Sequence, residues 1–199
     1  NKIINPVTNK EMQGCVLYRW QEDYKQYEFK YEENCSILTY ASHYVNYGGL
    51  YNDYFNSGIA TSDGGYVAVG ATNSENIEGL EKKDTTINND ALIVKFDNKG
   101  NIIWQDTFGG SGIDTFVDII EITENNKKYY IAVGNGSSID GDLFLNGITS
   151  SYDKPIIVKY DDNGNIVDKK IFSDRGYNTC IKKISDGYII VGLVNYDDE

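Results

Sequence analysis

The chain repeats itself, and this self-similarity constrains its fold more than any other feature. Residues 90–102, Asp-Ala-Leu-Ile-Val-Lys-Phe-Asp-Asn-Lys-Gly-Asn-Ile, return 64 residues later as Lys-Pro-Ile-Ile-Val-Lys-Tyr-Asp-Asp-Asn-Gly-Asn-Ile at 154–166. A second motif, Tyr-Val-Ala-Val-Gly at 66–70, returns in similar form at 130–134 and 188–192. Repeats of this length indicate one supersecondary unit used several times, in which neighbouring units bury the faces that a single unit would expose.

The middle copy of the unit predicts four strands. Residues 114–123 are rich in β-branched side chains, and residues 129–135 form an apolar run that indicates burial on both faces. After a long polar loop, 154–161 predict a third strand and, beyond an Asp-Asn-Gly turn, 165–172 predict a more polar strand at the outer edge. Four antiparallel strands joined in sequence make a meander, as in a β-propeller blade. An all-β fold of such blades is favoured over an open β-sandwich, which would not need this self-similarity.

The repeat divides one domain, 1–199, into a divergent first unit, two repeat units and a partial last unit, with boundaries at 1–47, 48–108, 109–172 and 173–199. This amounts to about three blades, whereas a closed propeller has four to eight. We therefore expect one of three arrangements. The chain is a fragment of a longer protein, or it completes a ring as a homodimer, or its last strands pair with its N-terminal strands.

Composition and charge narrow the class of protein. Apolar residues make up 40% of the 199 residues and tyrosine alone numbers 17, which is typical of a folded chain with a core. No apolar run approaches the roughly 20 residues that span a bilayer, so no membrane span is predicted. The formal net charge of −12 would repel phosphate backbones, and nucleic-acid binding is not expected. An acidic surface suits solubility outside the cell, or cation binding.

The cysteines and the single histidine do not form a recognisable site. Cys15, Cys35 and Cys180 show no Cys-x-x-Cys spacing, and with His43 alone beside them zinc binding is not expected. Cys15 and Cys35 could pair if their strands are neighbours. Cys180 aligns with Phe116 of the preceding unit, which predicts a buried apolar position. The cysteines therefore do not indicate whether the protein is found in an oxidising or a reducing compartment.

Three acidic segments are candidates for cation binding. In residues 97–100 and 161–164 the glycine is not at the position that a calcium loop requires, and the distant glutamate is missing. We interpret both segments as hairpin turns. Asp140, Asp142 and Asn146 are better placed, because two carboxylates and an amide lie within one long loop beside a flexible glycine. They predict a weak calcium site, with a solvated acidic loop as the alternative. No other cofactor is expected.

Recurring polar and aromatic residues suggest structural roles. Trp104 follows a hairpin turn and is predicted to dock on the next blade. Asp53, Asp114 and Asn178 are aligned at the start of each first strand and are predicted to cap turns, with exposure on one face of a ring as the alternative. The N-terminal aromatic residues are interpreted as core, or alternatively as a contact surface; they are Tyr18, Trp20, Tyr24, Tyr27, Tyr31, Tyr40, Tyr44 and Tyr47.

These motifs resemble a repeat family of bacterial secreted and cell-surface proteins. The resemblance rests on residues 61–70 (Thr-Ser-Asp-Gly-Gly-Tyr-Val-Ala-Val-Gly), 91–104 (the Ile-Val-Lys-Phe-Asp run through Trp104) and 108–114 (Phe-Gly-Gly-Ser-Gly-Ile-Asp). Residues 138–147 look like the Asp-Gly-Asp insert of that family. Over 48–192 the resemblance implies propeller-like blades and a bacterial, exported location, either secreted or on the cell surface as an adhesin or lipoprotein. It implies no single activity.

Sequence motifs of catalysis are absent. The chain has no Gly-x-Ser-x-Gly, no Cys/His pair with a plausible partner and no phosphate-binding glycine loop followed by lysine, so no catalytic residue is assigned. We expect a non-catalytic extracellular binding or adhesion module whose ligand is a glycan or a protein. Two alternatives remain. One is a glycan-active enzyme, or an accessory domain of one, since paired carboxylates are a tertiary feature. The other is a structural spacer.

Overall fold

The computed structural model describes residues 46–82, 88–145, 149 and 151–194, together with the backbone of 15–21 and 26–32. The chain divides into two compact units, Asn1–Tyr44 and Val45–Glu199. In the first unit, β1 (Cys15–Gln21) pairs antiparallel with β2 (Gln26–Glu32) as a separate two-stranded sheet.

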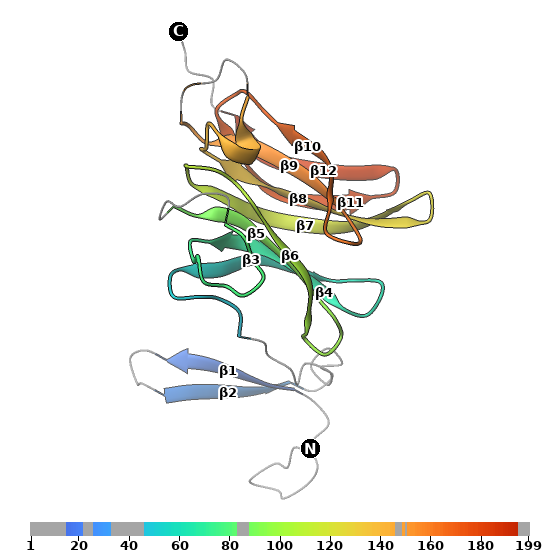
Figure 1. Ribbon diagram of the computed structural model, residues 1–199. Helices are drawn as coiled ribbons and strands as arrows, with labels where there is room; N and C mark the ends of the chain where they lie inside the picture. The colour runs from blue at the N-terminus through green and yellow to red at the C-terminus, as the bar shows by residue number, and fades with distance from the viewer. Residues whose placement is uncertain are drawn as a thin grey trace, which may run out of the picture. The chain divides into compact units, whose positions relative to one another are not determined.

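The second unit contains two four-stranded antiparallel sheets and one two-stranded sheet (Figure 1). The first sheet has the order β3 (Asp53–Ala60), β4 (Tyr66–Thr72), β5 (Asp90–Phe96) and β6 (Ile102–Phe108). The second has the order β7 (Asp114–Glu124), β8 (Lys127–Gly136), β9 (Lys154–Asp161) and β10 (Ile166–Ile171). The third pairs β11 (Gly176–Ile184) with β12 (Gly187–Val194). The predicted all-β fold of four-stranded meanders is confirmed, and the described strands form no closed ring.

The strands of the second sheet lie where the repeat predicted them. β8 is buried on both faces through residues 130–134, and the exposed β10 lies at the sheet edge. The connection between β8 and β9 contains a short 3-10 helix, η1 (Gly141–Leu143). None of the helical segments that the structure describes is long and apolar enough to cross a membrane.

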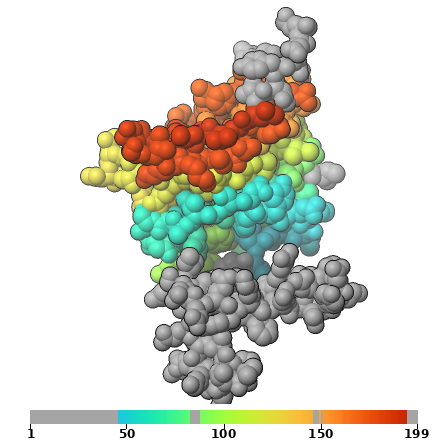
Figure 2. Space-filling model, turned by 180° about the vertical axis from the view of Figure 1, so that it is seen from behind, coloured from blue at the N-terminus to red at the C-terminus, as the bar shows by residue number. Residues whose placement is uncertain are grey.

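The three sheets of the second unit stack as layers, seen in cyan, yellow and orange-red in Figure 2. β7 lies against β3, β4 and β5, while β11 lies against β7, β8 and β9. Each first strand therefore packs on the sheet that precedes it in the chain, which is the contact expected of neighbouring blades.

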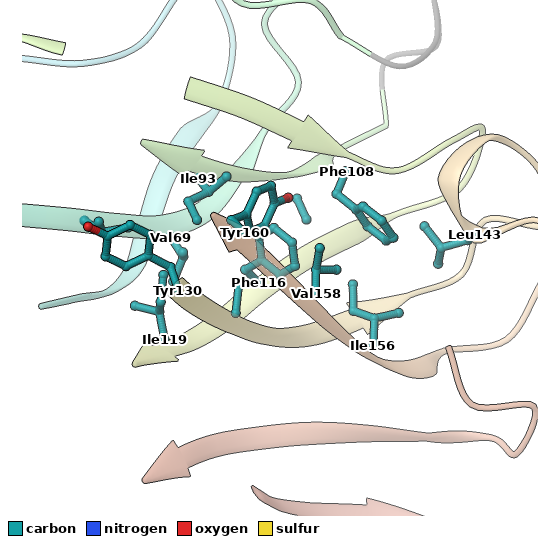
Figure 3. Close-up of a cluster of buried hydrophobic side chains, with 13 residues drawn as sticks. Val69, Ile93, Phe108, Phe116, Ile119, Tyr130, Leu143, Ile156, Val158 and Tyr160 are labelled. Carbon is teal, nitrogen blue, oxygen red and sulfur yellow. The ribbon is translucent and has the colours of Figure 1, made fainter. Parts of the chain in front are cut away.

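The main core fills the space between the first two sheets (Figure 3). Val69, Ile93 and Phe108 from the first sheet face Phe116 and Tyr160 from the second, and all five are fully buried. The ring centroids of Phe116 and Tyr160 are 6.3 Å apart in an edge-on contact. Burying a side chain of this size contributes about 1.5–3 kcal/mol, so this layer dominates the stability of the stack.

A smaller core joins the second sheet to the third. Ile131 and Val133 of β8 are buried against Ile181 of β11, and Ile190 of β12 packs on the same cluster. Because side chains alternate along a strand, β8 uses Tyr130 and its even-numbered neighbours for one core and its odd-numbered residues for the other. This explains the uninterrupted apolar run that the sequence shows there.

Asp118 links all three sheets at their first strands. Its Oδ1 accepts a hydrogen bond from Ser57 Oγ on β3 at 2.7 Å. Its Oδ2 accepts from the Ile181 amide and Lys182 Nζ on β11, at 3.0 and 2.9 Å. Burial opposes its ionisation, but the hydrogen bonds from Ser57 and Lys182 outweigh it and lower the pKa of Asp118. The carboxylate is therefore an ionic link between layers.

The register of the third sheet corrects the sequence alignment. Each first strand has an irregularity at one place, between Phe55 and Ser57, Phe116 and Asp118, or Asn178 and Cys180. The residue before the irregularity pairs with a glycine in every case, namely Gly70, Gly134 or Gly192. Phe116 is thus equivalent to Asn178, two residues before the predicted Cys180. Cys180 is a free, partly exposed cysteine at the position of Asp118, and its prediction as a buried apolar residue is wrong.

Candidate functional site

The loop of residues 109–113, which connects β6 to β7, is held by side chains that bind its backbone. All five amides in succession donate to a side-chain oxygen. The acceptors, in chain order of the amides, are Asp142 Oδ2 (3.3 Å), Asp114 Oδ2 (3.0 Å), Asp140 Oδ1 (2.7 Å), Ser138 Oγ (2.7 Å) and Ser137 Oγ (2.8 Å). Four of these side chains come from the connection between β8 and β9, so two loops distant in sequence form one surface.

The first sheet repeats this arrangement in the loop that precedes β3. The amides of Gly49, Leu50, Tyr51 and Asn52 donate, in this order, to Asp53 Oδ2 (2.6 Å), Asn76 Oδ1 (2.8 Å), Ser74 Oγ (2.9 Å) and Asn73 Oδ1 (2.7 Å). The acceptors at 73, 74 and 76 precede those at 137, 138 and 140 by 64 residues each. Our sequence reasoning missed this feature, whose signal is a polar side chain at three matched positions.

The predicted calcium ligands take part in this loop. Asp140 and Asp142 direct carboxylate oxygens at the amides of Ser111 and Gly109, while Asn146 lies outside the described residues. Over the described ranges, no group of three or more His, Cys, Asp or Glu side chains is placed to hold a metal ion. Calcium binding stays a prediction, and a bound ion would compete with these amides for the carboxylates.

Two of the three predicted turn caps are confirmed. Asp53 accepts from the Gly49 amide and Ser74 Oγ, and Asp114 accepts from the Gly110 amide and Ser138 Oγ. The prediction for Asn178 is wrong. Its Nδ2 donates to the carbonyls of Gly134 (3.2 Å) and Ile156 (3.0 Å), and so it joins the third sheet to the second. The register difference of two residues accounts for this change of role.

Asp114 is the most perturbed carboxyl group of this surface. Burial raises the pKa of Asp114 to about 6 and the neighbouring charge of Asp90 acts in the same direction, against the hydrogen bonds from Ser138 and Gly110. Asp114 is fully buried, whereas an ordinary aspartate titrates near 4. The loop is therefore held by a carboxyl group whose ionisation is unfavourable in the folded state.

We expect Asp114 to make the unfolding free energy fall as pH rises. Its folded pKa lies above its unfolded value, so the folded state holds the proton more tightly, and stability is lost between about pH 4 and pH 6. The loss is at most about 3 kcal/mol, since one pKa unit corresponds to 1.36 kcal/mol. Urea denaturation from pH 4 to 7 should show this decline in the parent chain and a smaller one in Asp114→Asn. Parallel pH profiles for the two proteins would contradict the assignment.

A hollow opens beside the 109–113 loop. It has a volume of about 590 Å³, and its lining residues are Ile113, Ser137, Ser151, Tyr152, Asp153 and Arg175. A second hollow of about 320 Å³ shares Ile113, Ser137 and Ser151 with it. The Tyr152 hydroxyl donates to the Ser173 carbonyl at 2.8 Å, and Lys154 Nζ lies 5.3 Å from the ring centroid. The ring is thus held in place at the wall of an open, mixed polar and apolar surface.

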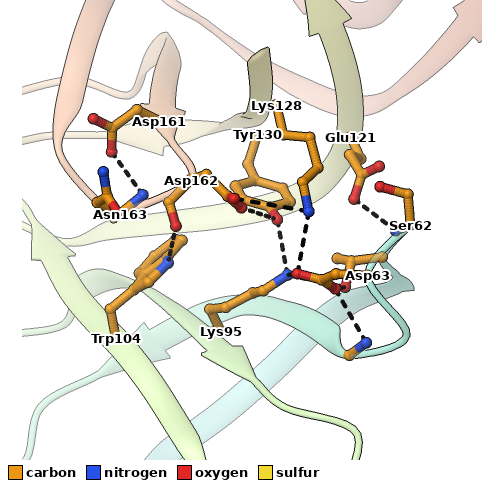
Figure 4. A network of polar contacts seen from close by, with 12 residues as sticks. Ser62, Asp63, Lys95, Trp104, Glu121, Lys128, Tyr130, Asp161, Asp162 and Asn163 are labelled. Carbon is orange, nitrogen blue, oxygen red and sulfur yellow. Dashed lines mark hydrogen bonds and ion pairs between the residues drawn. The ribbon is translucent and has the colours of Figure 1, made fainter. Parts of the chain in front are cut away.

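The opposite end of the stack carries a polar network around Lys95 (Figure 4). Lys95 is fully buried, and its Nζ donates to Thr61 Oγ1 (2.9 Å), Asp63 Oδ2 (2.7 Å) and Tyr130 Oη (2.8 Å). The Tyr130 hydroxyl in turn donates to Asp162 Oδ1 at 2.9 Å. The network therefore runs from a hairpin of the first sheet through a buried lysine to a hairpin of the second.

Two groups of this network, Asp63 and Tyr130, have pKa values far from neutral pH. The hydrogen bond from Lys95, followed by that from Thr61, holds the pKa of Asp63 well below its ordinary value. Burial, then the hydrogen bond to Asp162, raises the pKa of the Tyr130 hydroxyl well above its ordinary value. Neither group exchanges protons in the physiological range, so the geometry supports a structural link between sheets and not an acid–base pair.

The docking predicted for Trp104 is confirmed. Its indole stacks on Tyr160 with a centroid separation of 6.0 Å and an interplanar angle of 21°, and its Nε1 donates to the Asp162 carbonyl at 3.1 Å. The ring lies against Gly164 at the hairpin between β9 and β10. Asp168 occupies the aligned position in the second sheet and is exposed, so this contact has no counterpart there.

The two segments interpreted as hairpin turns are confirmed as turns. Asp97 Oδ1 accepts from the amides of Lys99 and Asn101 at 2.8 Å each. Asp161 Oδ1 accepts in the same way from Asn163 and Asn165 at 2.9 Å each. The hydrogen bonds from Asn101 are the main cause of the lowered pKa of Asp97. Each carboxylate therefore stabilises its own turn by accepting hydrogen bonds from the turn's backbone amides.

The N-terminal aromatic segment is described only in part. The core interpretation is confirmed for Tyr47, whose ring packs on Phe55 and Phe96 at centroid distances of 5.3 and 6.2 Å and whose hydroxyl donates to Gln105. The other aromatic residues singled out in the sequence lie on β1 or β2, where only the backbone is described, or outside the described residues: Tyr18, Trp20, Tyr24, Tyr27, Tyr31, Tyr40 and Tyr44. His43 and Cys35 also lie outside, and for Cys15 only the backbone is described.

The second unit thus has two organised polar regions. The loops held through their amides, with the hollow beside them, lie at one end of the stack, and the network around Lys95 lies at the other. Compared with protein-family models and with curated proteins, the chain has no match.

Proposed function

We propose that this chain is a non-catalytic binding module and that its ligand is a glycan bound in the hollow beside the 109–113 loop. The observation that carries the proposal is the fixed Tyr152 ring, with the exposed side chains of Asp153 and Arg175 in the same lining. A sugar ring presents an apolar C–H face and several hydroxyls. An aromatic face packs against the first, and a carboxylate and a guanidinium form hydrogen bonds with the second.

The loop architecture supports binding without turnover. Among the described residues that line the hollow, Asp153 is the one with a carboxyl group. Asp114 and Asp140, on the neighbouring loops, accept hydrogen bonds from backbone amides. A glycosidase needs two carboxyl groups directed at one substrate bond. In the described part of the chain, the hollow is lined by one carboxyl group, and the neighbouring Asp114 and Asp140 are occupied in holding the loop, which favours a binding role.

The location of the module outside a bacterial cell is part of the proposal. Its support is the resemblance of residues 48–192 to repeats of secreted and cell-surface proteins, and the net charge of −12, which suits an exposed acidic surface. In that setting the module would act as an adhesin or an accessory domain that attaches its parent protein to a glycan-covered surface.

Alanine in place of Tyr152 should weaken glycan binding at least tenfold without altering the fold. A glycan array would first identify a ligand, and isothermal titration would then compare the parent chain with Tyr152→Ala and with Tyr177→Ala, which removes an exposed tyrosine of β11 outside the hollow. The effect is expected to be large because a rigid aromatic ring gives an apolar sugar face a wide contact area at little cost in entropy. Equal weakening by both variants would contradict the assignment of the hollow.

The same experiment separates the other functions. Cleavage of the glycan during the titration would replace the proposal with a glycan-active enzyme. A ligand found only on a protein array would make the hollow part of a protein interface. A null result on both arrays would favour a structural spacer, and each of these outcomes would overturn the glycan proposal.

A further inference from the structure

The two hollows beside the 109–113 loop join into one groove. The larger hollow, of about 590 Å³, and the smaller hollow, of about 320 Å³, share Ile113, Ser137 and Ser151 in their linings. The other lining residues of the smaller hollow are Asn88, Ser111, Gly112 and Ile139. The groove is thus lined by the connections β4–β5, β6–β7, β8–β9 and β10–β11, and it crosses one end of all three sheets of the second unit.

The same backbone hydrogen bond occurs at both boundaries between these sheets. The Asp114 amide at the start of β7 donates to the Asn89 carbonyl at 2.8 Å. The Gly176 amide at the start of β11 donates to the Asp153 carbonyl at 2.9 Å. Each bond joins the first strand of one sheet to the residue that precedes the third strand of the sheet before it. The two boundaries are therefore built alike at this end of the stack.

The linings of the two hollows follow this equivalence. Asn88 lines the smaller hollow, and its Nδ2 donates to the Ser111 carbonyl at 2.8 Å. Tyr152 lines the larger hollow, and its hydroxyl donates to the Ser173 carbonyl at 2.8 Å. Each donor lies two residues before a third strand, and each carbonyl lies three residues before the first strand of the next sheet. The hollows are therefore equivalent positions of the repeat, one at each boundary.

The described lining of the groove carries no net charge. The smaller hollow is lined by three serines, an asparagine, a glycine and two isoleucines, none of which is ionisable. In the larger hollow, Asp153 and Arg175 have opposite charges. The chain as a whole has a net charge of −12, which would repel an anionic polymer. Hydroxyl and amide groups beside aliphatic side chains suit an uncharged sugar, which presents hydroxyls and an apolar C–H face.

We propose that the groove binds an uncharged linear polysaccharide, with sugar units of one chain in both hollows. This inference rests on the proposed function, because it takes the hollow at Tyr152 as a glycan site and adds the hollow at Asn88 as a second subsite. Stacked sheets lie about 10 Å apart, which is more than the width of one sugar ring, so a chain and not a single sugar reaches equivalent positions at two boundaries. A unit bound in one hollow holds the following units close to the other, and a longer chain therefore binds more tightly.

Size-graded oligosaccharides test the proposal on the full chain. The probes are the disaccharide to hexasaccharide series of cellulose, chitin and β-mannan, all of them linear and uncharged, and isothermal titration measures their affinities. We expect at least one series to bind, with an affinity that rises at least tenfold from the disaccharide to the hexasaccharide. Oligogalacturonides, a linear series with a carboxylate on every unit, should bind at least tenfold more weakly than the matching neutral series.

Ser111→Trp blocks the smaller hollow alone. The 109–113 loop is held through the amide and carbonyl of Ser111, which the substitution keeps, and the equivalent loop position of the first sheet carries Leu50, which is 79% exposed. The variant should bind the hexasaccharide at least tenfold more weakly, and the disaccharide, held by the Tyr152 ring in the larger hollow, within twofold of the parent chain. Leu50→Trp places the same side chain outside both hollows and should change neither affinity.

NMR gives a second readout that needs no variant. The side-chain amide signals of Asn88 should shift when the hexasaccharide is added and not when the disaccharide is added. Equal affinity along the series would confine binding to the larger hollow, and an equal loss of both probes in Ser111→Trp would show that the hollows are not separate subsites. Either result would overturn the inference and leave the glycan proposal standing.

The choice of polysaccharide can fail separately. Tighter binding of the oligogalacturonides, or binding of none of the three neutral series by a chain that binds another glycan on the array, would also overturn the inference alone. Absence of binding to any glycan would overturn both this inference and the proposed function.

Discussion

Alanine in place of Lys95 is expected to lower the free energy of unfolding by about 2–4 kcal/mol. The buried ammonium joins Thr61, Asp63 and Tyr130, and its removal leaves their oxygens with fewer donors and leaves a gap where the aliphatic stem packed. Asp63 keeps hydrogen bonds from Thr61 and the Gly65 amide, and its side chain is 35% exposed, so the loss stays below that of a fully buried ion pair.

Lys159→Ala is the matched control, because Lys159 occupies the same repeat position in the second sheet. Its Nζ binds Glu124 at 2.5 Å, but the two side chains are 21% and 50% exposed. We expect a loss of about 0–1 kcal/mol, as for other solvent-exposed pairs. Chemical denaturation of both variants gives the comparison. Equal losses at the two positions would show that the repeat, and not the burial of Lys95, determines the effect.

Alanine in place of Gly164 is expected to cost about 2–5 kcal/mol, through the neighbouring blade as well as through its own turn. The backbone at Gly164 has a φ of +85°, which costs a non-glycine residue about 1–2 kcal/mol. A Cβ there would also come within 2.7 Å of the Trp104 indole. Overpacking of this kind adds about 1–3 kcal/mol. Thermal and urea unfolding, with tryptophan fluorescence as the probe, would measure the loss and the displacement of the indole.

Gly64→Ala separates the two contributions. Gly64 has a φ of +87° in a comparable turn, and a Cβ there would meet nothing within 4 Å. We expect a loss of about 1–2 kcal/mol with unchanged tryptophan fluorescence. If Gly164→Ala lowers the free energy of unfolding no more than Gly64→Ala does, the Trp104 indole can move aside without loss of stability. Its docking would then not hold the sheets together.

Much of the fold could be predicted because strands and turns depend on near neighbours in sequence. The apolar run at 129–135 and the Asp-Asn-Gly turn that follows Asp161 both predicted their elements correctly. The third sheet was misaligned because the spacing between units changes from 64 to 58 residues within a stretch that has no landmark. Only the strand pairing shows that Asn178, and not Cys180, lies opposite the glycine of the motif at 188–192.

The candidate site was harder to predict, for a physical reason. Asp140 and Asp142 stood out as carboxylates on a glycine-containing loop, a pattern that suits a cation as well as a backbone amide. Their amide partners lie about 30 residues away in sequence, and their proximity follows from the packing of two connections at one end of the stack. Lys95 gave no signal as a buried residue, since its acceptors come from another hairpin and another sheet.

The two loops are held through their backbone amides, so the course of the loop backbone does not depend on the loop's own side chains. The amides at 50–52 and at 111–113 have equivalent acceptors, yet the side chains at these positions are Leu-Tyr-Asn in one loop and Ser-Gly-Ile in the other. An outward side chain can therefore change through mutation while the backbone keeps its course. In a repeat built in this way, the exposed side chains of each blade, and with them the ligand that the blade recognises, can change while the blade keeps its fold.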